Sequence, residues 1–205
     1  MIPLEECVAV LLCAGLSRRF GPGNKLLARL GGRPLVAHAA ELCRCVPFAG
    51  RVAVVPPGEP VLRGLLLDLG FDLVVNPRPE AGRDSSLRLG LGSALERAAR
   101  GVVVLLGDMP HIEEAHLGAL SAAADDETAA ISSAGGQLSP PTLIPAAAAR
   151  RAIAGVDRPV RASLGHPAEV TAPVSMLADY DCPEQFGIAA KPKGNPARPQ
   201  SSEHR

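Results

Sequence analysis

Residues 10–27 read Val10-Leu11-Leu12-Cys13-Ala14-Gly15-Leu16-Ser17-Arg18-Arg19-Phe20-Gly21-Pro22-Gly23-Asn24-Lys25-Leu26-Leu27. The apolar start predicts a buried strand, and the glycines and basic residues that follow predict a loop at the end of that strand. Glycines let the backbone approach an anion closely, and successive N–H groups can form a concave nest for phosphate oxygens. Because Arg18, Arg19 and Lys25 add positive charge, the stretch predicts a nucleoside triphosphate site.

The spacing of this loop excludes the two commonest glycine-rich nucleotide motifs. Gly15, Gly21 and Gly23 do not form G-x-G-x-x-G, and Lys25 is followed by Leu26, where a P-loop needs Ser or Thr. The loop resembles the L-A-A-G-x-S-x-R-F-G-x-x-N-K-L-L signature of the MobA-like nucleotidyltransferases, and within them the molybdenum cofactor cytidylyltransferases. A plain glycine turn with surface arginines is the alternative, and it leaves the fixed spacing of Gly, Ser, Arg and Lys unexplained.

The resemblance extends over residues 8–188 and implies roles for single residues of the loop. Arg19 and Lys25 are the implied catalytic cations. The implied nucleotide-binding residues here are Leu12, Cys13, Ala14, Gly15, Ser17, Arg19, Gly21 and Lys25.

Composition limits the partners of the chain. Its 205 residues suit one domain, and a hydrophobic content of 47% is ample for a core. The net charge is +0 and only 2% of residues are aromatic, so we expect no nucleic acid partner and no membrane association. No signal peptide or long apolar run is present, and the five cysteines show no zinc or redox spacing, which predicts a cytoplasmic protein.

Apolar runs alternate with amphipathic segments along the first two thirds of the chain. Strands are expected at 8–12, 52–55, 73–75, 102–106 and 128–131, with helices at 34–42, 60–69, 86–99 and 113–124. An alanine-rich helix, a strand at 170–174 and a short helix at 183–188 follow. The pattern predicts a single Rossmann-like three-layer α/β domain over residues 1–190 with a mostly parallel central sheet, similar to the nucleotide-diphospho-sugar transferases. Residues 191–205 are rich in proline and charge and predict a disordered tail.

A carboxylate follows the most hydrophobic of these strands. In Gly107-Asp108-Met109-Pro110, Asp108 is expected at the carboxyl edge of the sheet, where ligands of such folds bind. Mg²⁺ prefers one or two carboxylates together with phosphate oxygens and water. Taken alone, Asp108 fits a turn or helix cap equally well. The resembled family holds its magnesium with the aspartate of this motif, so we expect Asp108 to be a metal ligand and a catalytic residue.

Two further segments complete the expected nucleotide half. Residues 178–185 resemble the D-x-D-T-P-E-D segment of the family, so Asp179 or Asp181 is a candidate second Mg²⁺ ligand, with Asp179 slightly preferred. Capping of a helix explains Asp181 equally well. Residues 81–91 resemble the family's G-M-S-S-S-L-R-x-G-L element, which implies that Ser85 and Ser86 begin a helix and contact the nucleotide. Asn76 is a weaker candidate for contact with the base or ribose.

The last third of the chain is expected to hold the acceptor. Residues 140–145 resemble the G-x-P-x-L-F segment of the family and residues 155–161 its G-D-x-G-A-R turn, which implies that Pro140, Pro141 and Arg161 bind the acceptor. The implied reaction transfers CMP from CTP to the phosphate of molybdenum-loaded molybdopterin, and a molybdenum hydroxylase is the implied recipient of the product. Three alternatives remain: another cytidylyl or sugar-phosphate nucleotidyltransferase, a pterin chaperone without chemistry, and a nicotinamide-dependent oxidoreductase, which the missing G-x-G-x-x-G disfavours.

Overall fold

The computed structural model describes residues 1–17, 19–21 and 23–187. A seven-stranded sheet forms the centre, in the order β5-β4-β1-β6-β8-β7-β9. All neighbouring strands are parallel except where β8 pairs with β6 and with β7. The strands are β1 (Cys7–Leu12), β4 (Gly50–Val55), β5 (Asp72–Val75), β6 (Gly101–Leu106), β7 (Ala130–Ala134), β8 (Gln137–Pro145) and β9 (Ala168–Thr171).

The two central strands, β1 and β6, are buried along their whole length. Both faces of such a parallel strand lie under helices, which is why their sequences are continuously apolar rather than alternating. The α-helices are α1 (Leu35–Cys45), α2 (Pro60–Asp68), α3 (Arg83–Leu95), α4 (Glu114–Ala123) and α5 (Ala146–Ala154). A small hairpin pairs β2 (Arg29–Leu30) with β3 (Arg33–Pro34).

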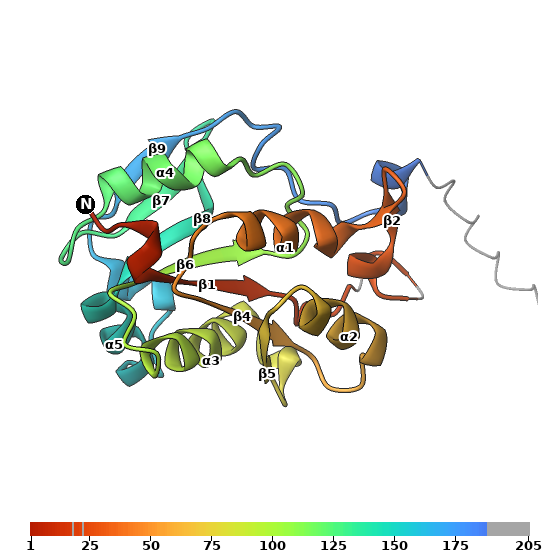
Figure 1. Cartoon of the computed structure of the whole chain (residues 1–205), viewed down its shortest axis with the longest axis horizontal. Helices are drawn as coiled ribbons and strands as arrows, with labels where there is room; N and C mark the ends of the chain where they lie inside the picture. Colours follow the sequence, from red (N-terminus) through yellow and green to blue (C-terminus); the bar gives the residue numbers. More distant parts are fainter. Residues whose placement is uncertain (18, 22, 188–205) are drawn as a thin grey trace, which may run out of the picture.

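Helices cover both faces of the sheet, as two close approaches show. Gly90 of α3 lies against Val10 of β1 and Val54 of β4. Gly107, which directly follows β6, lies against Cys13 and against Val36 of α1. Side chains at 10 and 13 point to opposite faces of β1 and its extension, so α3 and α1 lie on opposite sides. The expected three-layer α/β fold is confirmed (Figure 1).

The main departure from expectation is β8, a long strand that the sequence pattern did not predict. It contains three prolines, which are rare inside strands, and the Pro140–Pro141 peptide is cis. The pairing of β7 with β8 shifts register between Ile131 and Ser132, and this irregularity accommodates the prolines. Gly135 and Gly136, with φ of 56° and 78°, form the tight turn between the two strands.

Several boundaries also differ. Helix α3 begins at Arg83 and not at Ser85 or Ser86, because Gly82, with φ of 94°, starts it. The strand expected at 170–174 is β9, at Ala168–Thr171, and the last element is the 3₁₀ helix η5 (Pro183–Phe186). The predicted tail at 191–205 lies outside the described residues. Among the described residues, no helix has the length and apolar character needed to cross a membrane.

Candidate functional site

A cavity of about 430 Å³ lies at the carboxyl edge of the sheet, where the loops after β1, β5 and β6 converge. Residues 179–187, called the C-terminal segment below, form one more wall of the cavity through Asp179 and Asp181. Figure 1 shows this segment beside the hairpin of β2 and β3. The lining residues are Leu12, Ala14, Gly15, Leu16, Ser17, Arg19, Lys25, Leu26, Pro79, Glu80, Gly82, Arg83, Ser86, Leu106, Asp108, Asp179 and Asp181. Asp108 therefore lies at the carboxyl edge of the sheet, as expected.

The loop after β1 turns back on itself and brings Lys25 into the cavity. Ser17 has a φ of 48°, and its carbonyl accepts a hydrogen bond from Phe20 N at 2.9 Å. The Ser17 hydroxyl accepts a second bond from Lys25 N at 3.4 Å. Asn24 then starts the 3₁₀ helix η2 (Lys25–Leu27), because its side chain accepts from Leu26 N at 3.0 Å. These local bonds orient the lysine toward the end of β6.

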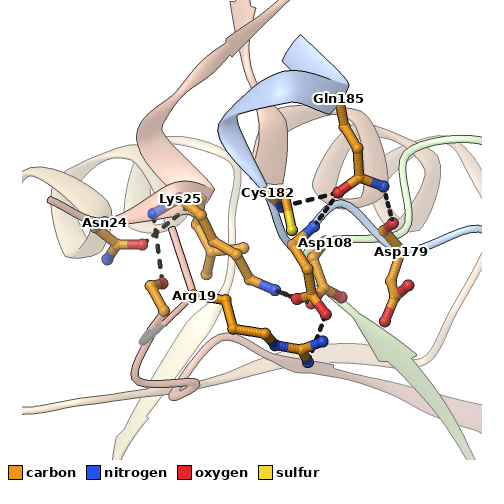
Figure 2. Close-up of polar contacts among 10 residues, drawn as sticks. Arg19, Asn24, Lys25, Asp108, Asp179, Cys182 and Gln185 are labelled. Carbon is orange, nitrogen blue, oxygen red and sulfur yellow. Dashed lines mark hydrogen bonds and ion pairs between the residues drawn. The ribbon is translucent and has the colours of Figure 1, made fainter. Parts of the chain in front are cut away.

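Lys25 joins two carboxylates from distant parts of the chain. Its amine donates to Asp108 Oδ2 at 2.6 Å and to Asp181 Oδ1 at 2.5 Å, and the lysine side chain is only 9% exposed. Arg19 Nη2 lies 2.6 Å from the other oxygen of Asp181. Figure 2 shows Lys25 and Arg19 pointing into this cluster from the loop. Arg19 and Lys25, the two implied catalytic cations, thus face the candidate metal ligands, whereas Arg18 lies outside the described residues.

The contacts in this cluster shift the pKa of Lys25 and the pKa of Asp181. Burial lowers the pKa of Lys25, but the charges of Asp108 and Asp181 outweigh burial, so the pKa rises above its ordinary 10.5. Burial raises the pKa of Asp181, but the hydrogen bond and charge of Lys25 and the charge of Arg19 outweigh it, so the pKa falls below its ordinary value. Near neutral pH Lys25 is therefore charged and Asp181 ionised.

Asp108 carries the clearest indication of a cation site. Its Oδ2 atom accepts from Lys25, but its Oδ1 atom is buried and has no hydrogen-bond partner among the described residues. An unpartnered buried carboxylate oxygen is costly, and a divalent cation satisfies it. Within the described part of the chain, no group of three or more His, Cys, Asp or Glu side chains forms a metal centre. The unpartnered oxygen of Asp108, with the Asp181 carboxylate close by, is compatible with a divalent cation that takes its remaining ligands from phosphate oxygens and water.

The C-terminal segment is attached to the loop after β6 and to the glycine-rich loop. Tyr180 N donates to Asp108 O at 3.0 Å. The Tyr180 and Phe186 rings lie 5.3 Å apart, and Phe186 lies 5.4 Å from Phe20, both edge to face. His111 adds a 3.0 Å hydrogen bond to the Tyr180 hydroxyl. The chain has only one Tyr and four Phe, and three of these five residues meet here. The sequence analysis did not predict this aromatic cluster.

The remaining nucleotide candidates divide into two groups. Ser86 lines the cavity, whereas Ser85, Cys13 and Gly21 do not. Asn76 is 1% exposed and does not line the cavity; it donates to Ser85 Oγ at 2.9 Å and to Ser86 Oγ at 2.8 Å, and so holds the first turn of α3 in place. Burial raises the pKa of Cys13 well above its ordinary value, and its thiol packs against Gly107.

The acceptor candidates lie apart from this cavity. Pro140 and Pro141 belong to β8 and Arg161 to the 3₁₀ helix η4 (Val160–Leu164), and none of the three lines the cavity. Two side chains of α3 secure the loop that leads to Arg161. Arg88 donates to Ala152 O at 3.1 Å, to Gly155 O at 3.0 Å and to Arg158 O, and Asp84 Oδ2 accepts from Val160 N at 3.0 Å.

The cavity also contains residues that the sequence did not predict to be part of the site. Pro79, Glu80, Gly82 and Arg83 line it between β5 and α3. Arg83 is close enough to Asp181 for its charge to lower the pKa of that carboxyl. Arg83 is the first residue of α3, so its contribution to the cavity depends on where that helix begins.

Comparison with known proteins places the fold and the family. The family described as the MobA-like NTP transferase domain matches residues 9–169. Rv0371c from Mycobacterium tuberculosis has a TM-score of 0.75 at 21% identity, over 91% of this chain and 97% of that protein, and a complex of Rv0371c with manganese scores 0.65. Molybdopterin-guanine dinucleotide biosynthesis protein A from Archaeoglobus fulgidus scores 0.61 at 20% identity, over 88% of this chain and 95% of that protein.

One curated protein matches by sequence over a shorter stretch. A 2-C-methyl-D-erythritol 4-phosphate cytidylyltransferase from Dehalococcoides mccartyi is 39% identical over 51 residues. The match covers 25% of this chain and spans about a fifth, 22%, of that relative's length.

Proposed function

Since this chain belongs to the MobA-like NTP transferase family, we propose that it transfers the cytidylyl group of CTP to the terminal phosphate of a molybdenum-loaded molybdopterin. The products are a molybdopterin cytosine dinucleotide and pyrophosphate. The family match and the fold support a nucleotidyltransferase, and the choice of CTP and of the pterin is our proposal.

A single observation supports the chemistry most directly. Lys25 and Asp108 meet at 2.6 Å beside the glycine-rich loop, and Asp108 Oδ1 remains buried without a partner. This is the arrangement that a metal-bound triphosphate needs: a fixed cation, a hard oxygen ligand and backbone N–H groups. We assign Asp108 and Asp181 to Mg²⁺, which when bound supplies neutralisation of charge on the phosphates.

The proposed reaction is an in-line displacement at the α-phosphorus of CTP. An oxygen of the acceptor phosphate attacks, the bond between the α-phosphorus and its bridging oxygen breaks, and pyrophosphate leaves. Lys25 and Arg19 donate hydrogen bonds to phosphate oxygens as charge builds on them, after exchanging their present partner Asp181 for the substrate. Backbone N–H groups of Gly15 and its neighbours orient the chain of phosphates. No side chain has to form a covalent intermediate.

The choice of base rests on the start of the glycine-rich loop. Ala14 lines the cavity two residues after the end of β1, where the guanylyltransferases of the resembled family read L-A-G-G and have glycine. A methyl group there reduces the space for a purine, which favours cytosine. The short match to a cytidylyltransferase agrees with this choice.

That match also favours a second candidate, in which CTP is retained and the acceptor is a smaller polyol phosphate. The two candidates differ in the acceptor alone. The residues predicted for pterin binding, Pro140, Pro141 and Arg161, lie outside the cavity, so an assay that offers both acceptors distinguishes the two candidates.

The test is release of pyrophosphate from CTP, GTP, ATP and UTP with Mg²⁺, in the presence of molybdenum-loaded molybdopterin or of 2-C-methyl-D-erythritol 4-phosphate. We expect release with CTP and the pterin, and its loss in Asp108→Ala. Release with CTP and the polyol phosphate alone selects the second candidate. Tight pterin binding without release from any nucleotide contradicts both and indicates a chaperone.

A further inference from the structure

We propose that Gln185 is a positioning residue of this site. Its carboxamide fixes the backbone of residues 179–182 and thereby holds the Asp181 carboxylate against Lys25 and Arg19. The inference rests on the proposed function, in which Asp181 completes the metal site.

Three hydrogen bonds carry the proposal. Gln185 Oε1 accepts from Asp181 N at 2.6 Å and from Cys182 N at 2.8 Å, and Gln185 Nε2 donates to Asp179 O at 2.9 Å. Figure 2 shows the carboxamide between the Asp179 and Cys182 segments, with the Lys25 cluster beneath. One side chain therefore bonds backbone groups before, at and after Asp181.

The arrangement requires an amide rather than an acid. Two N–H groups need an acceptor and one carbonyl needs a donor, and only a carboxamide offers both at adjacent atoms. A glutamate accepts the same two N–H bonds but has no proton for Asp179 O at neutral pH. A glutamate also places a third negative charge beside Asp179 and Asp181. The resembled family has an acidic residue where this chain has Gln185, so the bond to Asp179 O is specific to the glutamine.

Capping of η5 is the competing explanation for Gln185. The bond to Cys182 N forms half of a capping box, which Glu and Gln serve equally well. The bonds to Asp181 N and Asp179 O lie outside that motif and act on the segment that carries the two cavity carboxylates. If Gln185 only caps η5, its substitution changes the stability of the protein by the same amount whatever residue stands at position 181. If Gln185 positions Asp181, its substitution affects the metal site only while that carboxylate is present.

A double-mutant cycle separates the two explanations. Mn²⁺ binding in the presence of CTP is measured by electron paramagnetic resonance in wild type, Gln185→Met, Asp181→Asn and the double variant, with thermal unfolding of each. Methionine keeps the length of the side chain and removes all three bonds. We expect Gln185→Met to weaken Mn²⁺ binding on the order of tenfold, as loss of partners behind a metal ligand does. In the Asp181→Asn background we expect a change of less than about twofold, since no carboxylate is left to position.

The neighbouring Glu184→Ala is the matched control, because Glu184 is exposed, belongs to the same 3₁₀ helix and has no side-chain hydrogen bond among the described residues. It is expected to leave Mn²⁺ binding unchanged. If Gln185→Met does not fold, Gln185→Glu, which keeps the two acceptor bonds and loses the donor, is taken through the same cycle.

The outcomes are distinct. Equal losses of Mn²⁺ binding in both backgrounds, or a loss in Glu184→Ala as large as in Gln185→Met, overturn the positioning role and leave the proposed function standing. Failure of wild type to bind Mn²⁺ with CTP overturns the proposed function and this inference together.

Discussion

The Lys25 amine lies 2.6 Å from the Asp108 carboxylate, although 83 residues separate the two along the chain. The same amine reaches Asp181, a further 73 residues on, so one side chain joins the glycine-rich loop, the end of β6 and the C-terminal segment. The Lys25 side chain, which is only 9% exposed, neutralises the charge of two carboxylates, and in the proposed reaction it also binds phosphate. Its removal is expected to affect stability and turnover together.

For Lys25→Met, we expect turnover to fall by about two decades, which corresponds to a loss of about 3 kcal/mol of transition-state stabilisation. We also expect the free energy of unfolding to fall by about 2 kcal/mol, because Asp108 and Asp181 then lose the buried positive charge between them and only the exposed Arg19 remains beside Asp181. Chemical denaturation and steady-state kinetics measure the two effects. The control is Arg33→Met in the exposed Arg33–Glu41 pair, which should cost at most about 1 kcal/mol. Near-normal turnover of Lys25→Met would remove the lysine from the mechanism.

Asp108→Asn is expected to abolish metal binding without unfolding the protein. The asparagine carbonyl still accepts from Lys25, but the neutral side chain loses its affinity for a divalent cation. Turnover should fall by about 100-fold or more at saturating Mg²⁺. We also expect Mn²⁺ to bind weakly to wild type without nucleotide, because the site offers two carboxylates and needs phosphate oxygens for the rest.

Asp179→Asn is the comparison for Asp108→Asn. Asp179 lines the cavity, but Asp181 rather than Asp179 shares Lys25 with Asp108. The effect of Asp179→Asn on turnover should therefore be smaller than that of Asp181→Asn. Equal effects of the two substitutions would assign the second metal position to both carboxylates.

Gly90→Ala is expected to destabilise the fold, whereas Gly92→Ala on the same helix is not. A Cβ atom at Gly90 would lie 2.4 Å from Val10 Cγ1 and 3.1 Å from Val54 Cγ2, so α3 would have to move away from the sheet. We expect a loss of about 1–3 kcal/mol in the free energy of unfolding. At Gly92 nothing lies within 4 Å of the added atom, and a gain of up to about 1 kcal/mol follows from helix propensity. A stable Gly90→Ala variant would contradict this close packing of α3 on β1.

The lowered pKa of the buried His116 predicts that the protein loses stability on mild acidification. Burial lowers the pKa of His116 below its ordinary 6.5, although the charge of Glu113 opposes the shift. The imidazole Nε2 lies 2.8 Å from Ser132 Oγ, and that hydroxyl donates its single proton to Pro141 O at 2.7 Å, so the imidazole is the donor.

The sign of the pH dependence follows from these contacts. The contribution of His116 is fully present above pH 6.5, where both states are neutral, and it is lost as pH falls from 6.5 toward the folded pKa, because the unfolded chain binds the proton first. The free energies of unfolding of wild type and His116→Gln, measured by denaturation between pH 7.5 and 5 and plotted against pH, should therefore differ in slope by up to about 1.4 kcal/mol per pH unit. Parallel curves would show that the pKa of His116 is not lowered.

Local signals in the sequence were sufficient for most of the fold. Continuous apolar strands at 8–12 and 102–106 are found within a residue as β1 and β6, because burial under helices on both faces leaves an unmistakable pattern. The strand β8 was missed because Pro140 and Pro141 argue against a strand unless an irregular pairing accommodates them, and that pairing depends on β7. The start of α3 was misplaced because two serines indicate a cap, whereas the geometry of Gly82 determines the start.

For the candidate site, local sequence signals specify which residue types follow which strand: a glycine-rich basic loop after β1 and a single aspartate after β6. Those features are local, and a parallel sheet brings the ends of its strands to one edge, so the residues predicted there meet. Their pairing follows from the folded arrangement instead: Lys25 contacts both Asp108 and Asp181, Gln185 lies behind Asp181, and Asn76 bonds Ser85 and Ser86. Such pairings depend on where side chains from distant segments end in space, to within a fraction of an ångström, and no spacing along the chain carries that information.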